Sequence, residues 1–415
     1  MTGTAPGSAA VRRAQLVLAG VVALQLVAET ALTPYWPLLF RRIFGIEELA
    51  ATGSYLAICR VAGLLALPLW GLAALRWPVR TLLVSGLAAS AVLDLALALA
   101  PTWWFFAGFS AGVVATGSVL VLAYPALIAV TERPGRVDRR TGVVTYWAVF
   151  HASLVLATVI GAGITMLAQP RLGLAAFAVV DLLLAVAVLV LVPARPVRRR
   201  DTAVADPAPA TGGWRRFRPW LLLAVAVVTV DAALAVARPF FVELLLRDGA
   251  DAATASWLFL VPGLASLAVL PFAGALLDRF RRATAPLAAL VGGGGLLVQA
   301  VAALHGELGG MLLGRVLLGL GTGVLLVVLD LVVFDRIGTH GAAFSAIETG
   351  RAGALLAAPL LATLAAGTWL GAPLLVAALL LVLSGALLAP AQPRHLARPL
   401  SVPLLEASDD LDPVP

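Results

Sequence analysis

The chain has 415 residues, of which 61% are hydrophobic and only 12% are charged. Because a water-soluble domain carries about 25% charged residues, this composition excludes a soluble globule. The formal net charge is +7, every basic residue is an arginine, and Cys59 is the single cysteine. One cysteine excludes a disulfide framework and a thiolate metal site.

Apolar segments long enough to cross a membrane follow one another along the chain, since a helical span needs about 20 mostly apolar residues. They are too long and too little alternating for the strands of a membrane barrel. In chain order we expect helices at 14–39, 52–71, 79–99, 102–130, 141–168, 172–192, 219–246, 254–274, 284–304, 310–334, 342–366 and 372–390. The sequence therefore predicts an all-α integral membrane protein with 12 transmembrane helices.

A polar stretch divides these segments into two groups of six. Residues 193–218 are rich in Arg, Pro, Ala and Gly and have no apolar face, which is typical of a flexible linker. We expect six-helix halves at 1–192 and 219–390, with a cytoplasmic linker at 193–218 and a cytoplasmic tail at 391–415.

The arginines predict the orientation of the chain. If the N-terminus is cytoplasmic, most arginines outside the segments fall in the tails, the linker and the inner loops, and the outer loops hold only Arg41, Arg42, Arg171 and Arg247. Cytoplasmic loops of membrane proteins are enriched in Arg. We therefore expect a multi-pass protein of the cell (inner) membrane with both termini cytoplasmic. The same distribution explains the basic charge without nucleic acid as a partner.

The two groups of segments repeat each other. In segment one the acid Glu29 stands eight positions before Pro37, and in segment seven Asp231 stands eight positions before Pro239. The offset between the two pairs is 202 residues. Two six-helix repeats in parallel register are one of the known plans of membrane transporters.

Several motifs carry a family resemblance. The turn GALLDRFRR at 274–282, with a degraded copy GLAALRWPVR at 71–80, resembles a signature of the major facilitator superfamily: a Gly, then Asp-Arg, then basic residues. RVLLGLGTG at 315–323 resembles that family's Arg-then-glycines pattern. TPYWP at 33–37 resembles the helix-one proline motif of its 12-helix drug:proton antiporters. The stretch LATVIGAG at 156–163 departs from those antiporters, which usually carry a Gly-Pro pair there.

The resemblance implies two pseudo-symmetric halves that rock around a central cavity, and a secondary active transporter as the function. We expect a monomeric, proton-coupled exporter of a small amphipathic molecule (a drug, a siderophore or a secreted metabolite) with protons and membrane lipid as its other partners. A proton-coupled importer of a nutrient or a siderophore complex is the alternative within transport. A transport-inactive membrane sensor or scaffold is the alternative outside it.

Enzymatic chemistry finds no support in the residues. No Ser-His-Asp set, HExxH motif or Cys/His metal spacing is present in the sequence. The glycine runs lie inside apolar segments without a preceding strand or a Walker lysine, so they are not phosphate loops. We expect no enzyme activity, no cofactor and no metal.

Charged residues inside the segments are the candidates for function, because a charge at the bilayer centre costs about 2.5–3.5 kcal/mol. They therefore face the interior, pair with one another or serve transport. For proton coupling we expect Glu29, Asp231, Glu348 and Arg315. For substrate binding we expect Gln25, Thr33, Trp36, Arg60, Trp147, His151, Arg238 and Arg351.

Helical spacing supports these assignments. Gln25, Glu29, Thr33 and Trp36 share one helix face and form a predicted cavity stripe. Asp231 and Arg238 are seven positions apart on one face, and Glu348 and Arg351 can pair three positions apart. A structural hydrogen bond or a static ion pair to another helix is the alternative for each acid.

Three further sets remain open. Arg60 needs an acidic partner, either Glu29 or Glu348, and His151 either transfers protons or is a packed core residue. As single carboxyls without an evident partner we count Asp94, Asp181 and Asp330. For gating we expect an inner-loop set of Gly274, Asp278, Arg279 and Arg282, in which the resemblance implies that Asp278 pairs across the halves. The alternative is that this loop only sets topology.

Overall fold

The computed structural model describes residues 20–21, 23, 27–28, 30–122, 139–192, 214–337 and 342–391. Within these residues 11 helices are long and apolar enough to cross a membrane, and the remaining predicted segment, 14–39, is described only in part. The first half contains α2 (Trp36–Phe44), α3 (Leu49–Ala74), α4 (Val79–Ala98), α5 (Trp103–Gly117), α7 (Arg139–Met166) and α8 (Pro170–Leu191). The second half contains α9 (Trp214–Val236), α10 (Phe241–Arg247), α11 (Ala252–Phe280), α12 (Thr284–His305), α13 (Leu308–Arg336), α14 (Ala342–Thr368) and α15 (Ala372–Ala391). Short 3₁₀ turns are η1 (Thr33–Tyr35), η2 (Ser118–Leu122) and η3 (Arg281–Ala283).

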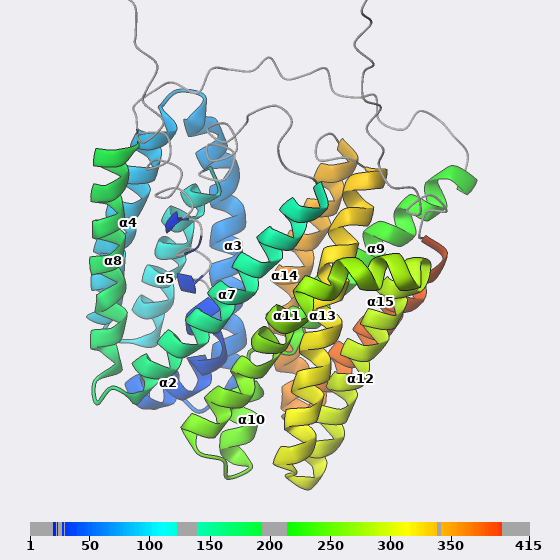
Figure 1. Ribbon diagram of the computed structural model, residues 1–415. Helices are drawn as coiled ribbons and strands as arrows, with labels where there is room; N and C mark the ends of the chain where they lie inside the picture. Colours follow the sequence, from blue (N-terminus) through cyan, green and yellow to red (C-terminus); the bar gives the residue numbers. More distant parts are fainter. Residues whose placement is uncertain are drawn as a thin grey trace, which may run out of the picture.

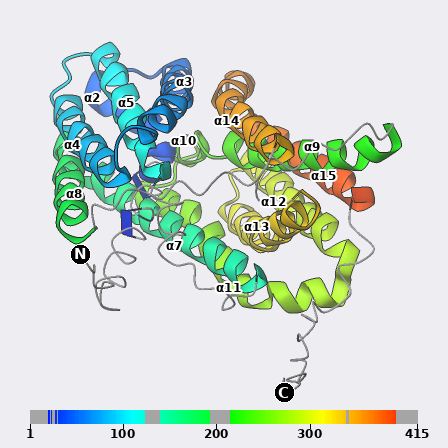
Figure 2. The same ribbon diagram turned by 90° about the horizontal axis from the view of Figure 1, so that it is seen from above.

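The helices form two bundles side by side, α2 to α8 in one and α9 to α15 in the other (Figure 1). Two helix pairs make most of the contact between them: α7 runs along α11, and α3 packs against α14. Seen from above, these four helices border the region between the bundles (Figure 2). The all-α membrane fold predicted from hydropathy is confirmed.

Two of the predicted helices are interrupted, at equivalent places in the two halves. The first segment passes through η1 before α2 begins, with Pro34 and Pro37 at the break. In the second half α9 ends at Val236 and α10 begins at Phe241, with Pro239 between them. Proline lacks a backbone N–H and clashes with the preceding turn. The segments expected at 14–39 and 219–246 therefore each contain a break at a proline, and the second of them still forms one candidate membrane span, Arg218–Arg247.

Helix α11 is longer than its sequence predicts. Asp251 caps its first turn, where the backbone N–H of Thr254 donates a hydrogen bond of 2.6 Å to the carboxylate, and this bond holds the pKa of Asp251 below its ordinary value. The helix then continues to Phe280 instead of ending at 274. No proline interrupts the chain there, and Leu and Arg are good helix formers. Gly274 and Asp278 therefore lie on a helix, which corrects their expected place in a loop.

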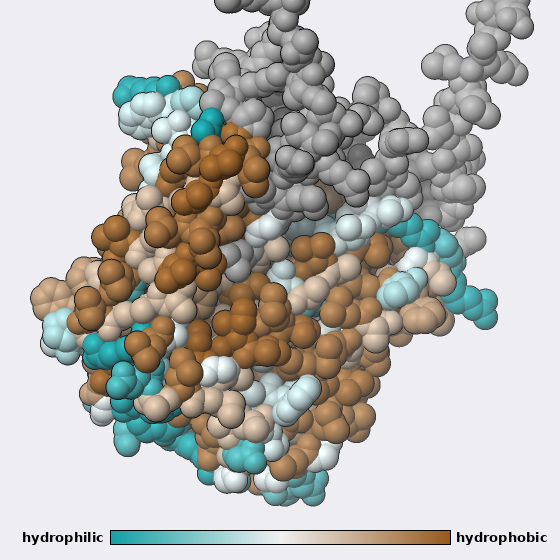
Figure 3. All heavy atoms as spheres, turned by 60° about the vertical axis from the view of Figure 1, so that its left-hand side comes forward, coloured by the Kyte–Doolittle hydropathy of each residue, from teal (hydrophilic) through white to brown (hydrophobic). Residues whose placement is uncertain are grey.

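The outer surface of the bundles is apolar over a wide area. Many leucines and valines are exposed, among them Leu65, Leu69 and Leu72 of α3 and Val190 of α8. Figure 3 shows this surface as a broad apolar area on one face, with hydrophilic side chains gathered mainly toward its upper and lower margins. Such a surface is far larger than soluble proteins expose and fits contact with lipid tails.

Candidate functional site

An ion pair joins the two halves at the end of the bundle where α2 ends. Arg41 donates from Nη1 and Nη2 to the two carboxylate oxygens of Glu243, at 3.2 and 2.9 Å. Arg247 donates from Nε to the same carboxylate at 2.8 Å, and the Glu243 side chain is only 3% exposed. We call this the Arg41–Glu243 end. Neither Arg41 nor Glu243 is among the residues predicted from the sequence to bind substrate, couple protons or gate.

A signal for this pair is present in the sequence. Arg41 stands four positions after Pro37, and Glu243 stands four positions after Pro239. The two residues are 202 positions apart, which is the offset of the internal repeat. Equivalent positions of the two halves thus carry opposite charges, and these positions are in contact where the two halves meet.

A second ion pair joins the halves at the opposite end. Arg140 of α7 and Asp278 of α11 approach to between 3.3 and 3.4 Å, with side chains 35% and 71% exposed. A Cβ atom at Gly274 would lie 2.6 Å from the Arg140 guanidinium, so the glycine leaves room for this arginine. Arg279 and Arg282 form no ion pair with the described residues. Asp278 thus bridges the halves, and its role as a gate stays a prediction.

Four charged residues, which we call the Arg351 cluster, meet inside the second half. Arg351 of α14 donates from Nε to Asp231 at 2.6 Å and from Nη1 to Glu348 at 3.1 Å, and its Nη2 lies 3.8 Å from Asp330. Trp147 of α7 donates from its indole to Asp330 at 2.9 Å, which links the cluster to the first half. Three carboxyl groups share one guanidinium. In a membrane interior such a cluster carries excess negative charge unless it binds protons.

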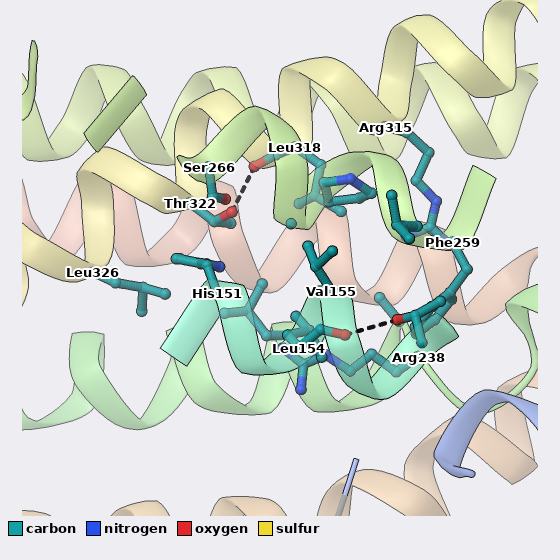
Figure 4. A pocket seen from close by; sticks show the side chains of 16 residues that line it. His151, Leu154, Val155, Arg238, Phe259, Ser266, Arg315, Leu318, Thr322 and Leu326 are labelled. Atoms are coloured by element: carbon teal, nitrogen blue, oxygen red, sulfur yellow. Dashed lines mark hydrogen bonds between the residues drawn. The ribbon is translucent and has the colours of Figure 1, made fainter. Parts of the chain in front are cut away.

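A small cavity of about 50 Å³ lies between the halves, among α7, α11, α13 and the break between α9 and α10. We call it the Arg315 cavity. Figure 4 shows His151 entering it from α7, while Arg238, Phe259 and Arg315 lie together at one side. Arg315 is 3% exposed, and its guanidinium carbon lies 3.1 Å from the ring centroid of Phe241.

The polar atoms facing this cavity are poorly satisfied. Among the described residues, Nε and Nη2 of Arg315 and both ring nitrogens of His151 have no hydrogen-bond partner. Arg315 forms no ion pair there either. Arg238 adds a second positive charge to the same wall. Stacking on an aromatic ring contributes only about 2 kcal/mol, so a buried guanidinium still favours a negatively charged partner.

A larger cavity of about 160 Å³ lies inside the first half, and we call it the N-half cavity. Thr33 and Trp36 line it together with Arg60 of α3, Asp94 of α4 and Asp181 of α8. Thr33 and Trp36 thus line a cavity inside one half, away from the Arg315 cavity between the halves.

Arg60 has no acidic partner among the described residues. Of the two partners expected for it, Glu348 bonds to Arg351, and Glu29 lies outside the described residues. Gln25 also lies outside them. The geometry of the predicted stripe that includes Glu29 therefore stays an expectation.

Of the remaining predicted residues, Arg238 lines the Arg315 cavity, whereas Asp231 and Trp147 belong to the contacts of the Arg351 cluster. Asp231 and Arg238 are not lined up in one cavity, because the helix ends between them and Asp231 turns to Arg351. Only Arg238 lines the Arg315 cavity. Trp147 lines neither of the two cavities and serves as a hydrogen-bond donor to Asp330.

Comparison with known proteins finds a family match in the second half of the chain. Residues 223–408 match the family model of the Major Facilitator Superfamily. No curated protein matches the chain in sequence. The match lies on the second half, and the membrane-spanning helices extend through both halves. The match supports a Major Facilitator Superfamily transporter with small molecules as substrates, and the membrane-spanning helices make the chain a multi-pass membrane protein.

Proposed function

We propose that the protein is a proton-coupled exporter of a small amphipathic molecule that carries an acid group. The observation that supports it is the Arg315 cavity, in which a buried guanidinium lacks a counter-charge. Holding an isolated charge in an apolar interior costs several kcal/mol. A carboxylate or phosphate that binds there relieves this cost and forms charge-assisted hydrogen bonds. The uncompensated positive charge of the empty site therefore favours the binding of an acidic substrate.

The lining supplies both parts of an amphipathic ligand site. Arg315 and Arg238 face the acid group, and His151 is placed to donate a further hydrogen bond. Leu154 and Phe259 supply apolar walls for the rest of the molecule. A cavity of about 50 Å³ holds only a few water molecules. The substrate therefore binds in a more open arrangement of the halves, as alternating access requires.

The Arg351 cluster supplies a site for the coupling proton. Arg351 pairs with three carboxyls. One carboxyl can therefore bind a proton while the guanidinium stays paired with the other two. The bond from Trp147 to Asp330 connects this cluster to α7, which also carries His151. A proton on Asp330 or Asp231 changes the charge that Arg351 compensates, and thereby the contact between the halves. Glu29 is the corresponding candidate in the first half.

The test is transport by the purified protein in liposomes under an imposed pH gradient, with a panel of amphipathic acids, zwitterions and cations. We expect movement of an acid against proton flow, and a loss of about tenfold or more in Arg238→Gln and Arg315→Met. Arg315→Met should fold, because replacing a buried unpaired charge by an apolar group does not destabilise a core. Arg218→Gln removes an exposed arginine outside the cavity and should transport normally.

Two outcomes would contradict the proposal. If the protein bound only lipophilic cations and Arg238→Ala left that binding unchanged, the acid group would be wrong. If the solute moved in the same direction as protons, the protein would be an importer, which the missing Gly-Pro pair at Ala157 and Thr158 leaves as the alternative. If no solute moved and no proton flux responded, the protein would be a transport-inactive sensor or scaffold instead of a transporter.

A further inference from the structure

The N-half cavity has a different character from the Arg315 cavity. It lies within one half, surrounded by the first segment, α3, α4, α5 and α8. Its volume of about 160 Å³ exceeds that of the Arg315 cavity. Helices α4 and α8, which are in extensive contact with each other, each contribute a carboxyl group to its wall.

The two carboxyls lack a positive partner. Asp94 on α4 is 7% exposed and forms no hydrogen bond or ion pair with the described residues. Asp181 on α8 is partly buried and lines the same cavity as Asp94. Two carboxylates that line one small cavity in an apolar interior repel each other, so a cation that accompanies them lowers the cost of charging both.

Arg60 does not neutralise this pair. It lines the same cavity but is itself an exposed residue, and it forms no ion pair with Asp94 or Asp181. Arg60 therefore lies where the cavity wall is exposed, while Asp94 lies where the wall is buried.

Aromatic side chains complete the wall. Trp36, Tyr55 and Phe177 line the cavity, and the Tyr55 hydroxyl donates to Ser110 at 3.1 Å. Aromatic faces attract organic cations, and the attraction is stronger where water is excluded. A metal cation is instead held by a shell of several oxygen ligands at short distance. The combination of two carboxyls, ring faces and space beyond that of a single ion favours an organic cation.

We propose that the N-half cavity binds a small organic ammonium group, with Asp94 and Asp181 as its counter-ions. The ammonium protons bond to the carboxylates, and the carbon atoms contact the rings of Trp36 and Phe177. This site is separate from the anion-binding Arg315 cavity. Its occupancy is measured by binding alone, so that a failure here leaves the proposed transport function untouched, and the reverse.

The chain contains its own reporter for this site. Cys59, the only cysteine, lines the cavity and is 8% exposed. In detergent, its thiolate attacks a methanethiosulfonate reagent, forms a mixed disulfide and releases methanesulfinate. The rate is compared for the cationic aminoethyl reagent and the anionic sulfonatoethyl reagent, each divided by its rate with free 2-mercaptoethanol. We expect the cation to react at least about tenfold faster, because clefts of one charge concentrate the opposite charge.

Protection identifies the ligand. Ethylammonium chloride should slow labelling by the aminoethyl reagent, and potassium chloride at the same concentration should not. Asp94→Asn and the double variant Asp94→Asn/Asp181→Asn should lose both the cation preference and the protection. Glu47→Gln removes an exposed acid from the same half outside the cavity and should retain both.

Three results would overturn the proposal. Protection by potassium chloride equal to that by ethylammonium chloride would assign the site to a metal cation. No protection of the natural protein by any cation would mean that the two carboxyls share a proton. Unchanged protection in the double variant would place the ammonium elsewhere. If the double variant fails to fold, the comparison of salts on the natural protein still decides.

Discussion

The ion pair at the Arg41–Glu243 end makes a quantitative prediction about opening of the transporter. Glu243 is 3% exposed, whereas the side chain of Arg41 is 34% exposed. At a separation of 2.9 Å the Coulomb energy of two charges is about 6 kcal/mol at an effective dielectric constant of 20 and about 1.4 kcal/mol in water. Solvent screening of Arg41 and the desolvation of Glu243 reduce the net value. We expect a coupling of about 1–2 kcal/mol, or close to tenfold in an equilibrium.

This coupling acts only when the two halves are closed at this end, so its loss shifts the population toward the open state. Spin labels at Glu47→Cys and Ala253→Cys, both exposed positions, in a Cys59→Ala background report the distance between the halves. Glu243→Gln should raise the open population about tenfold. Arg41→Gln should do the same, and the double variant should add nothing further.

A matched control separates the contact between halves from the loss of a charge. Arg247 bonds to Glu243 within the same half, four positions along. Arg247→Gln therefore removes a bond to the same carboxylate without separating the halves, and should leave the distance distribution nearly unchanged. Independent, additive effects of Arg41→Gln and Glu243→Gln would refute the reasoning, because they would show no energetic coupling between the two side chains.

Further predictions concern the opposite end, the charged cluster and the helix packing. Asp278→Asn should change opening at its end less than about fivefold, because an exposed ion pair is worth at most about 1 kcal/mol; a tenfold change in the spin-label distances would contradict this. Arg351→Gln should lower the free energy of unfolding by about 3–5 kcal/mol, since it leaves carboxylates unpaired, and thermal unfolding that is unchanged would argue against the cluster. Gly161→Leu should destabilise the protein in the same assay, because a Cβ at Gly161 would overlap the carbonyl oxygen of Ala31. Gly163→Leu, which points into open space, should be tolerated, and equal loss in both variants would contradict the packing.

The sequence by itself determined the class and the plan of this protein. Apolar length is sufficient for this, because a bilayer requires about 20 apolar residues per span and leaves helices as the form for such segments. The offset of 202 residues between Pro37 and Pro239 also predicts two related halves, and both prolines lie at helix breaks. The pair Glu348 and Arg351 follows from spacing within one helix.

The partners across helices were decided only by the tertiary structure. Spacing along one helix indicates that Asp231 and Arg238 share a face, yet Asp231 bonds to Arg351 of another helix. Asp94 and Asp181 are isolated carboxyls in the sequence, and the packing of α4 against α8 brings them into one cavity. Hydrophobicity sets where a helix crosses the membrane, but its tilt and rotation follow from packing against neighbours. Those two quantities decide which charges meet, and therefore where this transporter can hold a substrate.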